Sequence, residues 1–510
     1  MMNLTDTSPP AGPAKSPWRL WLGVLLAGTI LYAATAQRGV SWQDSGMFQW
    51  RVLQADFHGE LGLALAHPLY IAAGQVCRIA GPEHLPMMLN MFSGLGMALA
   101  AANCAAVALL WTSRRWIAWA TAGMLLVAHT AWWLATIAEV YTWSVAGLTA
   151  EIWLLSLLLR RPTSGRLAGL AFLSGLGVCI HNFALLPLPV YLVVAIGLIV
   201  RKQLKPSALA LAAAAWVLGA GPYLAMVAQL AIQSGDWGFA IHSALFGEYA
   251  EQVLNVAGRS SNFKANMALT ALNFISLLGP LALVGFARLP KRLGGGLGWA
   301  VLGLTGVELA FFIRYNVPDQ FTFFLPSLVM LVLAAGVGLD WLAGRSGTLG
   351  KIAIVSAVVS VVLPPAAYGF GPRLLRAAGV KIQRSRSLPY RDEMRYWIVP
   401  WKHNEDSAER FARAGLDQAD GHVILADTTS MFPLHLRRQL GDRAVEVWPA
   451  GHNSVAALAS PTRLSEALDG RGLFVVSPGQ GNIPAWLAAA DLPAETRDGP
   501  LRLILPPQGQ

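Results

Sequence analysis

Charged residues and cysteines are both scarce in this sequence. Charged side chains make up 13% of its 510 residues, whereas soluble globular domains carry about 25%. An ordinary soluble domain is therefore excluded. The three cysteines, Cys77, Cys104 and Cys179, form no close pair, so neither a disulfide framework nor a thiolate metal site is predicted. The ten histidines also lack ligand spacing. No cofactor or protein metal site is predicted. The sequence does not exclude a role for a divalent cation.

Long apolar runs dominate the first three quarters of the chain instead. A helix of about 20 apolar residues crosses the hydrocarbon core of a bilayer. The sequence predicts about eleven such spans, near residues 18–36, 88–111, 117–136, 142–159, 167–180, 183–200, 207–231, 266–286, 297–313, 321–341 and 352–370. We interpret the first run as a retained helix rather than a cleaved signal, because further membrane segments follow it.

Basic and acidic residues alternate from one loop between spans to the next. One set of loops holds bases such as Arg114 and Arg292, and the other holds acids such as Glu139 and Asp319. Cytoplasmic loops are enriched in Lys and Arg, so the tail of residues 1–17 is predicted to be cytoplasmic. An odd number of spans places the C-terminal region in the periplasm of a bacterial inner membrane. The net charge of +10 is explained in this way and does not indicate nucleic acid.

The predicted architecture is an all-α polytopic membrane bundle followed by a small α/β periplasmic domain. The bundle, residues 18–370, carries long outer loops at 37–87 and 232–265. An apolar segment in the first loop, LGLALAHPLYIAAGQV, is interrupted by His67-Pro68 and is typical of a re-entrant or interfacial helix. In residues 371–510, HVILADTTS and GLFVVSPG predict strands, and SAERFARAGLD and SPTRLSEALDG predict amphipathic helices.

Polar residues of several segments gather on the predicted outer side. The candidate site residues are Asp44 in WQDSGMFQWR, His67 in AHPLY, Glu139 and Tyr141 in AEVYTW, the pair His181 and Asn182, and Arg314, Asn316, Asp319 and Gln320 in RYNVPDQ. Carboxylates, imidazoles, amides and a guanidinium at one membrane depth favour a site for a lipid-linked substrate.

Asp44 is the candidate catalytic base. A hydroxyl nucleophile has a pKa far above 7, so its attack benefits from a positioned carboxylate. The alternative is a helix N-cap, since Asp before Ser-Gly is typical of a helix start. The neighbouring Trp42 and Trp50 are interpreted as residues of an interfacial belt.

The other candidates also have structural alternatives. Arg314 can grip a phosphate with two hydrogen bonds and stabilise charge on a leaving group, or it can be a snorkelling residue at a helix end. Glu139 can orient an acceptor or be a solvated loop residue. His67 can contact sugar or phosphate, or be an interfacial histidine with satisfied hydrogen bonds.

Ionisable residues also lie inside apolar spans. Such groups are costly and are functional or paired. For Glu151, Glu308 and His129 we favour hydrogen bonds that lock the bundle. Asp427 in ILADTTSMFPLHLRR has two interpretations, binding of an acceptor or a structural turn between a strand and a helix, and we favour the turn.

The outer motifs resemble the transmembrane O-mannosyltransferase-like family of the C-type glycosyltransferases. VSWQDSGMFQWRVL, AHPLY, AEVYTW, the HN pair after GLGVCI and NVPDQFTFFLP follow the order of that family over roughly residues 20–330. The resemblance implies a catalytic acid at Asp44, a polyprenyl-phosphate sugar as donor, and inversion at the anomeric carbon. The chain departs from the family at Met47, where an acid is common, and in the order of His181-Asn182. The acceptor stays open between protein, glycan and lipid.

Two other classes of function make different demands on the sequence. A transporter or flippase of lipid-linked sugars would have polar groups near mid-membrane and internal two-fold repetition. The sequence instead has its charge on one face and no repeat, although Glu151 and Glu308 keep this alternative open. A structural or assembly protein would not need the outer carboxylate Asp44.

Overall fold

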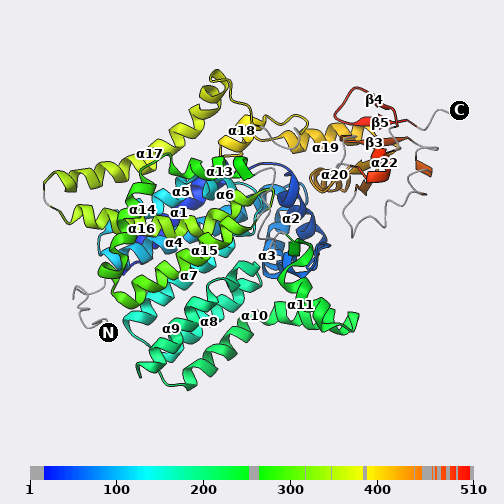
Figure 1. Cartoon of the computed structure of the whole chain (residues 1–510). Coiled ribbons are helices and arrows are strands. Elements are labelled where there is room, and N and C mark those ends of the chain that lie inside the picture. The colour runs from blue at the N-terminus through cyan, green and yellow to red at the C-terminus, as the bar shows by residue number, and fades with distance from the viewer. Residues whose placement is uncertain are drawn as a thin grey trace.

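The computed structural model describes residues 16–251, 263–315, 317–345, 347–382, 388–441, 443–450, 462, 466–467, 472–477, 483–489 and 492–505. A bundle of long helices fills one side of the molecule and carries the N-terminus (Figure 1). A small α/β unit on the other side carries the C-terminus. The short helices α2 and α3 lie between the two.

The bundle consists of long apolar helices. They are α1 (Trp18–Thr35), α4 (Leu85–Thr112), α5 (Arg115–Val127), α6 (His129–Ala135), α7 (Tyr141–Arg160), α8 (Ser164–Val178), α9 (Leu188–Val200), α10 (Ser207–Ser234), α13 (Phe263–Ala271), α14 (Leu278–Leu293), α15 (Gly295–Arg314), α16 (Leu325–Ala343) and α17 (Thr348–Ala377). Within the described ranges, nine segments are long and apolar enough to cross a membrane, or up to eleven with two bent pairs. The predicted polytopic bundle is confirmed.

The structure differs from the predicted spans in detail. The fifth predicted span corresponds to α8, which has only 15 residues, while Leu63–Ala80 meets the length and apolarity of a span. That segment is broken into the 3-10 helices η1 (Leu63–Leu65) and η2 (Gln75–Ala80) around α3 (Pro68–Gly74). With seven residues, α3 is about 10 Å long, which is too short to cross a bilayer by itself.

Two segments predicted as straight spans are bent. The chain turns by 66° between α5 and α6, and by 79° between Phe263–Phe274, which includes η5 (Leu272–Phe274), and α14. The side chain of Asn273 joins the two bends, because its Oδ1 accepts from the Thr130 backbone N–H at 3.0 Å and its Nδ2 donates to the Thr130 hydroxyl at 2.9 Å. A side chain distant in sequence thus satisfies a backbone donor that the start of α6 leaves free.

Two of the three ionisable residues inside the apolar spans, Glu151 and His129, tie elements together, in agreement with the structural interpretation. The Tyr191 hydroxyl of α9 donates to Glu151 Oε2 of α7 at 2.7 Å. His129 Nε2 donates to the Trp397 carbonyl at 2.9 Å and so connects α6 to α18 (Glu393–Ile398). Glu308 is buried on α15.

The small unit is built around a five-stranded sheet. Its elements after α18 are α19 (Ser407–Gln418), β1 (Val423–Ala426), α20 (Met431–Arg438), β2 (Glu446–Pro449), β3 (Leu473–Val475), α22 (Ala485–Ala489), β4 (Ala494–Thr496) and β5 (Arg502–Ile504). The strand order is β2-β1-β3-β5-β4, with β2, β1 and β3 parallel and β5 antiparallel to both of its neighbours.

The two strands that were predicted, β1 and β3, are neighbours within this sheet, and every residue of both is buried. The helix predicted for SAERFARAGLD is α19. Most of SPTRLSEALDG lies outside the described residues. Asp427 accepts from the Ser430 backbone N–H at 3.1 Å in the turn between β1 and α20, as the structural interpretation predicted.

The small unit packs directly on α2 (Gln43–Gln54). Trp42 Nε1 donates to the Ser407 hydroxyl at 2.8 Å, and the Gln43 backbone N–H donates to the Thr429 carbonyl at 3.1 Å. Trp42 is therefore buried in a protein core, and its interpretation as a membrane-belt residue is wrong. Trp50 likewise stacks on the His435 ring of α20, at 5.1 Å between centroids.

Candidate active site

Three carboxyl groups from distant parts of the chain meet at the end of the bundle nearest the small unit. Asp44 lies in the first turn of α2, Glu139 in the connection between α6 and α7, and Asp319 immediately before the 3-10 helix η6 (Gln320–Phe324). The charges of Asp44 and Asp319 each act on Glu139, and the charge of Asp319 acts on Asp44. The structure thus brings together all three predicted acidic residues.

Asp44 is not the N-cap of its helix. The N-cap is Trp42, and no side chain caps this end. Asp44 is exposed to solvent, although neighbouring protein atoms reduce the solvation of its carboxyl. Two effects together raise the pKa of Asp44 to about 7. The larger effect is the loss of solvation, and the smaller is the negative charge of Asp319. A carboxylate with this pKa is suited to accept a proton near neutral pH.

Glu139 is buried, with 6% of its surface exposed, so its interpretation as a solvated loop residue is wrong. The Ser45 hydroxyl donates to Glu139 Oε1 at 3.0 Å, and the Glu139 backbone N–H donates to the Ser93 hydroxyl at 2.8 Å. Burial, and then the charge of Asp44, raises the pKa of Glu139 well above its usual range. The carboxyl therefore keeps its proton to a higher pH than an ordinary glutamate does. Its Oε2 is buried and has no hydrogen-bond partner within the described part of the chain.

Two histidines stack beside the carboxyl groups. The rings of His67 and His181 lie 5.1 Å apart at 24°. His67 Nδ1 donates to the Ile180 carbonyl at 2.8 Å, which leaves its Nε2 as an acceptor. His181 Nδ1 accepts from the Phe183 backbone N–H at 3.1 Å, and burial lowers the pKa of His181 well below its usual range, so its Nε2 carries the proton. The pair offers one acceptor and one donor.

Arg51, which the sequence reasoning missed, holds the backbone that leads to His67. Its guanidinium donates to the carbonyls of Leu65 at 2.9 Å and Ala66 at 2.6 Å, and its Nε lies 3.4 Å from Asp56 Oδ2. His67 has a left-handed backbone with φ of +49°, a conformation that costs a non-glycine residue about 1–2 kcal/mol. The Arg51 contacts offset this strain and fix the histidine.

Aromatic rings surround the carboxyl groups. Tyr141 lies 5.3 Å from the His181 ring and 5.2 Å from Phe323, and Phe323 lies 4.5 Å from Tyr315. Burial, with a smaller contribution from the charges of Asp44 and Asp319, raises the pKa of both Tyr249 and Tyr315. Sequence reasoning missed these two tyrosines. For Tyr315 the sequence did hold a signal, namely its position inside the motif RYNVPDQ.

The remaining predicted residues are placed differently. Asn182 Nδ2 donates to the Ala244 carbonyl at 2.7 Å, and Gln320 Nε2 donates to the Phe312 carbonyl at the end of α15 at 2.8 Å, so both amides hold structure together. Arg314 is the last residue of α15, is exposed, and has no hydrogen bond or ion pair with any described residue. Asn316 lies outside the described residues.

The described residues contain no group of three or more His, Cys, Asp or Glu side chains that could hold a metal ion. The arrangement instead offers an accessible base, a buried carboxyl with a raised pKa, an imidazole pair and aromatic walls. Carboxylates and aromatic faces are typical of sites that bind and activate hydroxyl-rich molecules such as sugars.

The sequence matches no protein-family model and no curated protein. Its structure is similar to that of ArnT from Cupriavidus metallidurans bound to undecaprenyl phosphate, with 14% identity, a TM-score of 0.60, and coverage of 96% of this chain and 99% of that one. The apo state of the same protein matches with 13% identity, a TM-score of 0.57, and coverage of 97% and 100%. The chain has the C-type glycosyltransferase fold. Because the two matches cover 96% and 97% of this chain, the likeness extends over both the helical bundle and the small α/β unit.

Proposed function

We propose that this protein is a membrane glycosyltransferase that moves a sugar from a polyprenyl-phosphate donor to an acceptor hydroxyl, with Asp44 as the base. The observation that carries the proposal is the accessible Asp44 carboxyl, whose pKa is raised to about 7 within the three-carboxyl cluster. The similarity in fold to ArnT bound to undecaprenyl phosphate supports a lipid-phosphate donor.

The proposed reaction inverts the anomeric carbon. The acceptor oxygen forms a bond to C1 of the sugar while the bond between C1 and the phosphate oxygen breaks. The acceptor proton passes to Asp44, and the polyprenyl phosphate leaves with the electron pair. Because base and leaving group act on opposite sides of C1, the configuration at C1 inverts.

The residues around Asp44 have different proposed roles. Arg314, exposed at the end of α15, is proposed to hold the donor phosphate, since a guanidinium fits two phosphate oxygens. His67, His181 and Tyr141 form the wall against which the sugar packs. Asp319 adjusts the basicity of Asp44 through its charge.

The proposal includes the placement in the membrane. The site end of the bundle faces the periplasm and the N-terminus faces the cytoplasm of a bacterial inner membrane, because the bases gather in the loops of the opposite end. The acceptor is a protein, glycan or lipid hydroxyl delivered to the periplasmic side, and the small α/β unit beside α2 is positioned to present it.

The test uses purified full-length protein in lipid nanodiscs with a panel of polyprenyl-phosphate sugars and mass spectrometry of the products. We expect Asp44→Asn to lower transfer or donor hydrolysis by about 100-fold or more. Glu60→Gln is the matched control, because Glu60 is an exposed acid of the same outer loop. Arg314→Gln should raise KM for the donor more than it lowers kcat. If Asp44→Asn keeps full activity, Asp44 is not the base. If the native protein neither transfers nor hydrolyses any donor of the panel, the enzyme proposal fails, and passage of the lipid-linked sugar across vesicles would then favour a flippase.

A further inference from the structure

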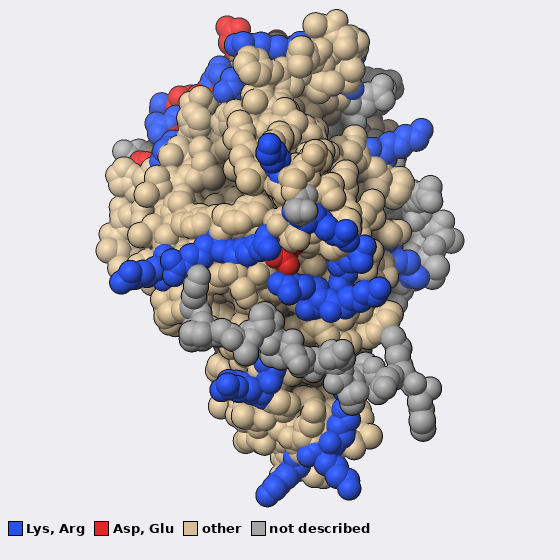
Figure 2. Space-filling model, turned by 90° about the vertical axis from the view of Figure 1, so that its left-hand side faces the viewer, with Lys and Arg blue, Asp and Glu red and all other residues tan. Residues whose placement is uncertain are grey.

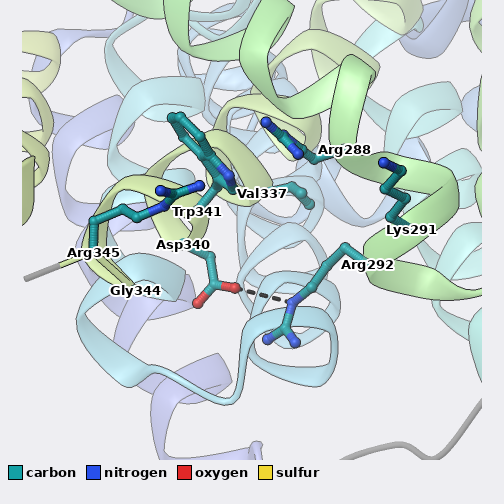
Figure 3. A pocket seen from close by; sticks show the side chains of 8 residues that line it. All are labelled: Arg288, Lys291, Arg292, Val337, Asp340, Trp341, Gly344 and Arg345. Atoms are coloured by element: carbon teal, nitrogen blue, oxygen red, sulfur yellow. Dashed lines mark ion pairs between the residues drawn. The ribbon is translucent and has the colours of Figure 1, made fainter.

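A second group of charged side chains lies at the opposite end of the bundle. Figure 2 looks at the left-hand side of Figure 1, where Lys and Arg side chains gather and acidic side chains are rare. A pocket of about 370 Å³ opens on this end, lined by Arg288, Lys291, Arg292, Val337, Asp340, Trp341, Gly344 and Arg345. Figure 3 shows the cationic side chains of α14 and Arg345 arranged around Trp341 and Asp340.

The pocket lies a full helix length from the candidate active site. Helix α16 begins directly after η6, beside the carboxyl cluster, and carries Asp340 and Trp341 near its other end. Its 19 residues span about 28 Å, which is close to the thickness of the hydrocarbon core. The pocket therefore lies at the depth of the lipid headgroups on the opposite membrane face.

The positive charge of this pocket exceeds what its one carboxylate can neutralise. Asp340 already pairs with Arg292, at 2.9 Å between Oδ2 and Nε, and with Arg114, at 3.3 Å between Oδ1 and Nε. Arg288, Lys291 and Arg345 form no ion pair with any residue that the structure describes. Three cations are thus left for an anion from outside.

Trp341 organises two of these free cations. The guanidinium carbons of Arg288 and Arg345 lie 4.7 Å and 4.8 Å from its ring centre, so one indole holds a guanidinium from α14 and another that follows α16. Each contact limits the rotation of a long side chain before any ligand arrives. A tryptophan at this depth also suits the interface between headgroups and acyl chains.

We propose that this pocket binds the phosphate of an anionic phospholipid in the leaflet opposite the active site. Two guanidinium groups and an ammonium suit the oxygens of a phosphodiester, and basic pockets between membrane helices recognise anionic headgroups. A lipid is the occupant that fits, because the pocket lies at headgroup depth near the end of the membrane-length helix α16 and includes Trp341, a residue type that favours the boundary between headgroups and acyl chains.

A general excess of positive charge on the cytoplasmic side supplies the bases, but it does not explain why Arg288 and Arg345 contact one indole at the edge of a pocket. Arg288 and Lys291 belong to the helix α14 rather than to a loop. The exposed bases Arg201 and Lys205, in the turn between α9 and α10, provide the comparison. Helix α9 begins near the candidate active site and ends before Arg201, so these two bases lie at the same end of the bundle as the pocket. They do not line the pocket.

The experiment measures lipid retention by the full-length protein in detergent, using native mass spectrometry with phosphatidylglycerol, cardiolipin or phosphatidylcholine. We expect the anionic lipids to bind in preference to phosphatidylcholine. The double substitution Arg288→Gln and Arg345→Gln should weaken anionic-lipid binding by roughly tenfold or more, because charge-assisted hydrogen bonds are lost. The control substitutions Arg201→Gln and Lys205→Gln should leave the affinity unchanged.

Three results would overturn the proposal. The first is unchanged lipid binding by the pocket variant, and the second is an equal loss in the control variant, which would mark general surface charge. The third is full displacement of the lipid by inorganic phosphate at millimolar concentration, which would show that the pocket takes a free anion. If the double variant does not fold, the exposed Lys291→Gln supplies the same comparison with a smaller expected loss.

Discussion

The Ser45 hydroxyl donates a 3.0 Å hydrogen bond to Glu139 Oε1 and so joins the residue next to the proposed base to a loop 94 residues away. Both partners are buried. The bond fixes the first turn of α2 against the connection between α6 and α7. The orientation of Asp44 thus depends on the buried Glu139 carboxyl, and the Glu139 backbone N–H in turn donates to the Ser93 hydroxyl.

Substitutions of Glu139 test whether this carboxyl is neutral. Because burial and the charge of Asp44 raise its pKa, Glu139→Gln should retain the acceptor for Ser45 and change the free energy of unfolding little. Glu139→Ala leaves the Ser45 hydroxyl buried without its acceptor and should cost about 1–3 kcal/mol. Thermal unfolding in detergent measures both. Equal destabilisation by Gln and Ala would mean that the carboxyl is ionised in the folded protein.

The pH dependence of transfer should follow the proposed base. Asp44 accepts a proton only when it is deprotonated, so kcat/KM should rise with pH and reach half of its plateau near pH 7. Asp319→Asn removes a negative charge that raises this pKa, so the midpoint should move to lower pH. Rates measured from about pH 5 to about pH 9 test both statements. The Glu60→Gln control should leave the midpoint unchanged. If Asp319→Asn also leaves the midpoint unchanged, the electrostatic coupling between Asp319 and Asp44 is contradicted.

The sequence predicted the helical bundle well because the signal for a membrane span is local. Every predicted apolar run coincides with a helix or with a bent pair of helices. The bends were not predictable, since they depend on the pairing of Asn273 with Thr130, 143 residues apart. The strands β2, β4 and β5 were also missed. They are three or four residues long and carry partly exposed positions that weaken the apolar signal.

The acidic residues of the site could be predicted because each stands in an outer segment beside an apolar run. Their surroundings could not. Tyr249, in the short 3-10 helix Gly247–Tyr249, lies near Asp44 and Asp319, but no sequence motif surrounds it. The structural role of Gln320 depends on the hydrogen bond from its amide to the end of α15. The burial of Trp42 depends on Ser407, which is 365 residues away in the small unit. Contacts of this kind leave no periodic pattern in the sequence.

Trp42→Phe should loosen the small unit from α2. The substitution keeps a ring against Phe411, at 4.9 Å in the native protein, but removes the N–H that bonds Ser407. We expect a loss of about 1 kcal/mol in stability and faster release of the small unit by protease. Trp50→Phe is the matched control, because the indole N–H of Trp50 makes no hydrogen bond to a described residue. Equal effects of the two substitutions would show that ring size, rather than the hydrogen bond, matters.

Gly46→Ala should impair activity by moving the proposed base. A Cβ at this position would lie 2.3 Å from the Ser41 carbonyl oxygen and 3.3 Å from Phe432 Cβ of α20. Backbone atoms cannot yield as a flexible side chain does, so α2 must shift, and Asp44 shifts with it. A displacement of about 1 Å at a reacting group costs about 100-fold in rate.

Gly147→Ala supplies the control for this prediction. Nothing lies within 4 Å of a Cβ built at Gly147, in the interior of α7. Alanine there should be neutral or should stabilise the helix by up to about 1 kcal/mol. Transfer rates and unfolding temperatures of the two variants separate geometry from a general effect of replacing glycine. Full activity of Gly46→Ala would mean that the close packing of Gly46 against the Ser41 carbonyl is not needed to hold Asp44 in place.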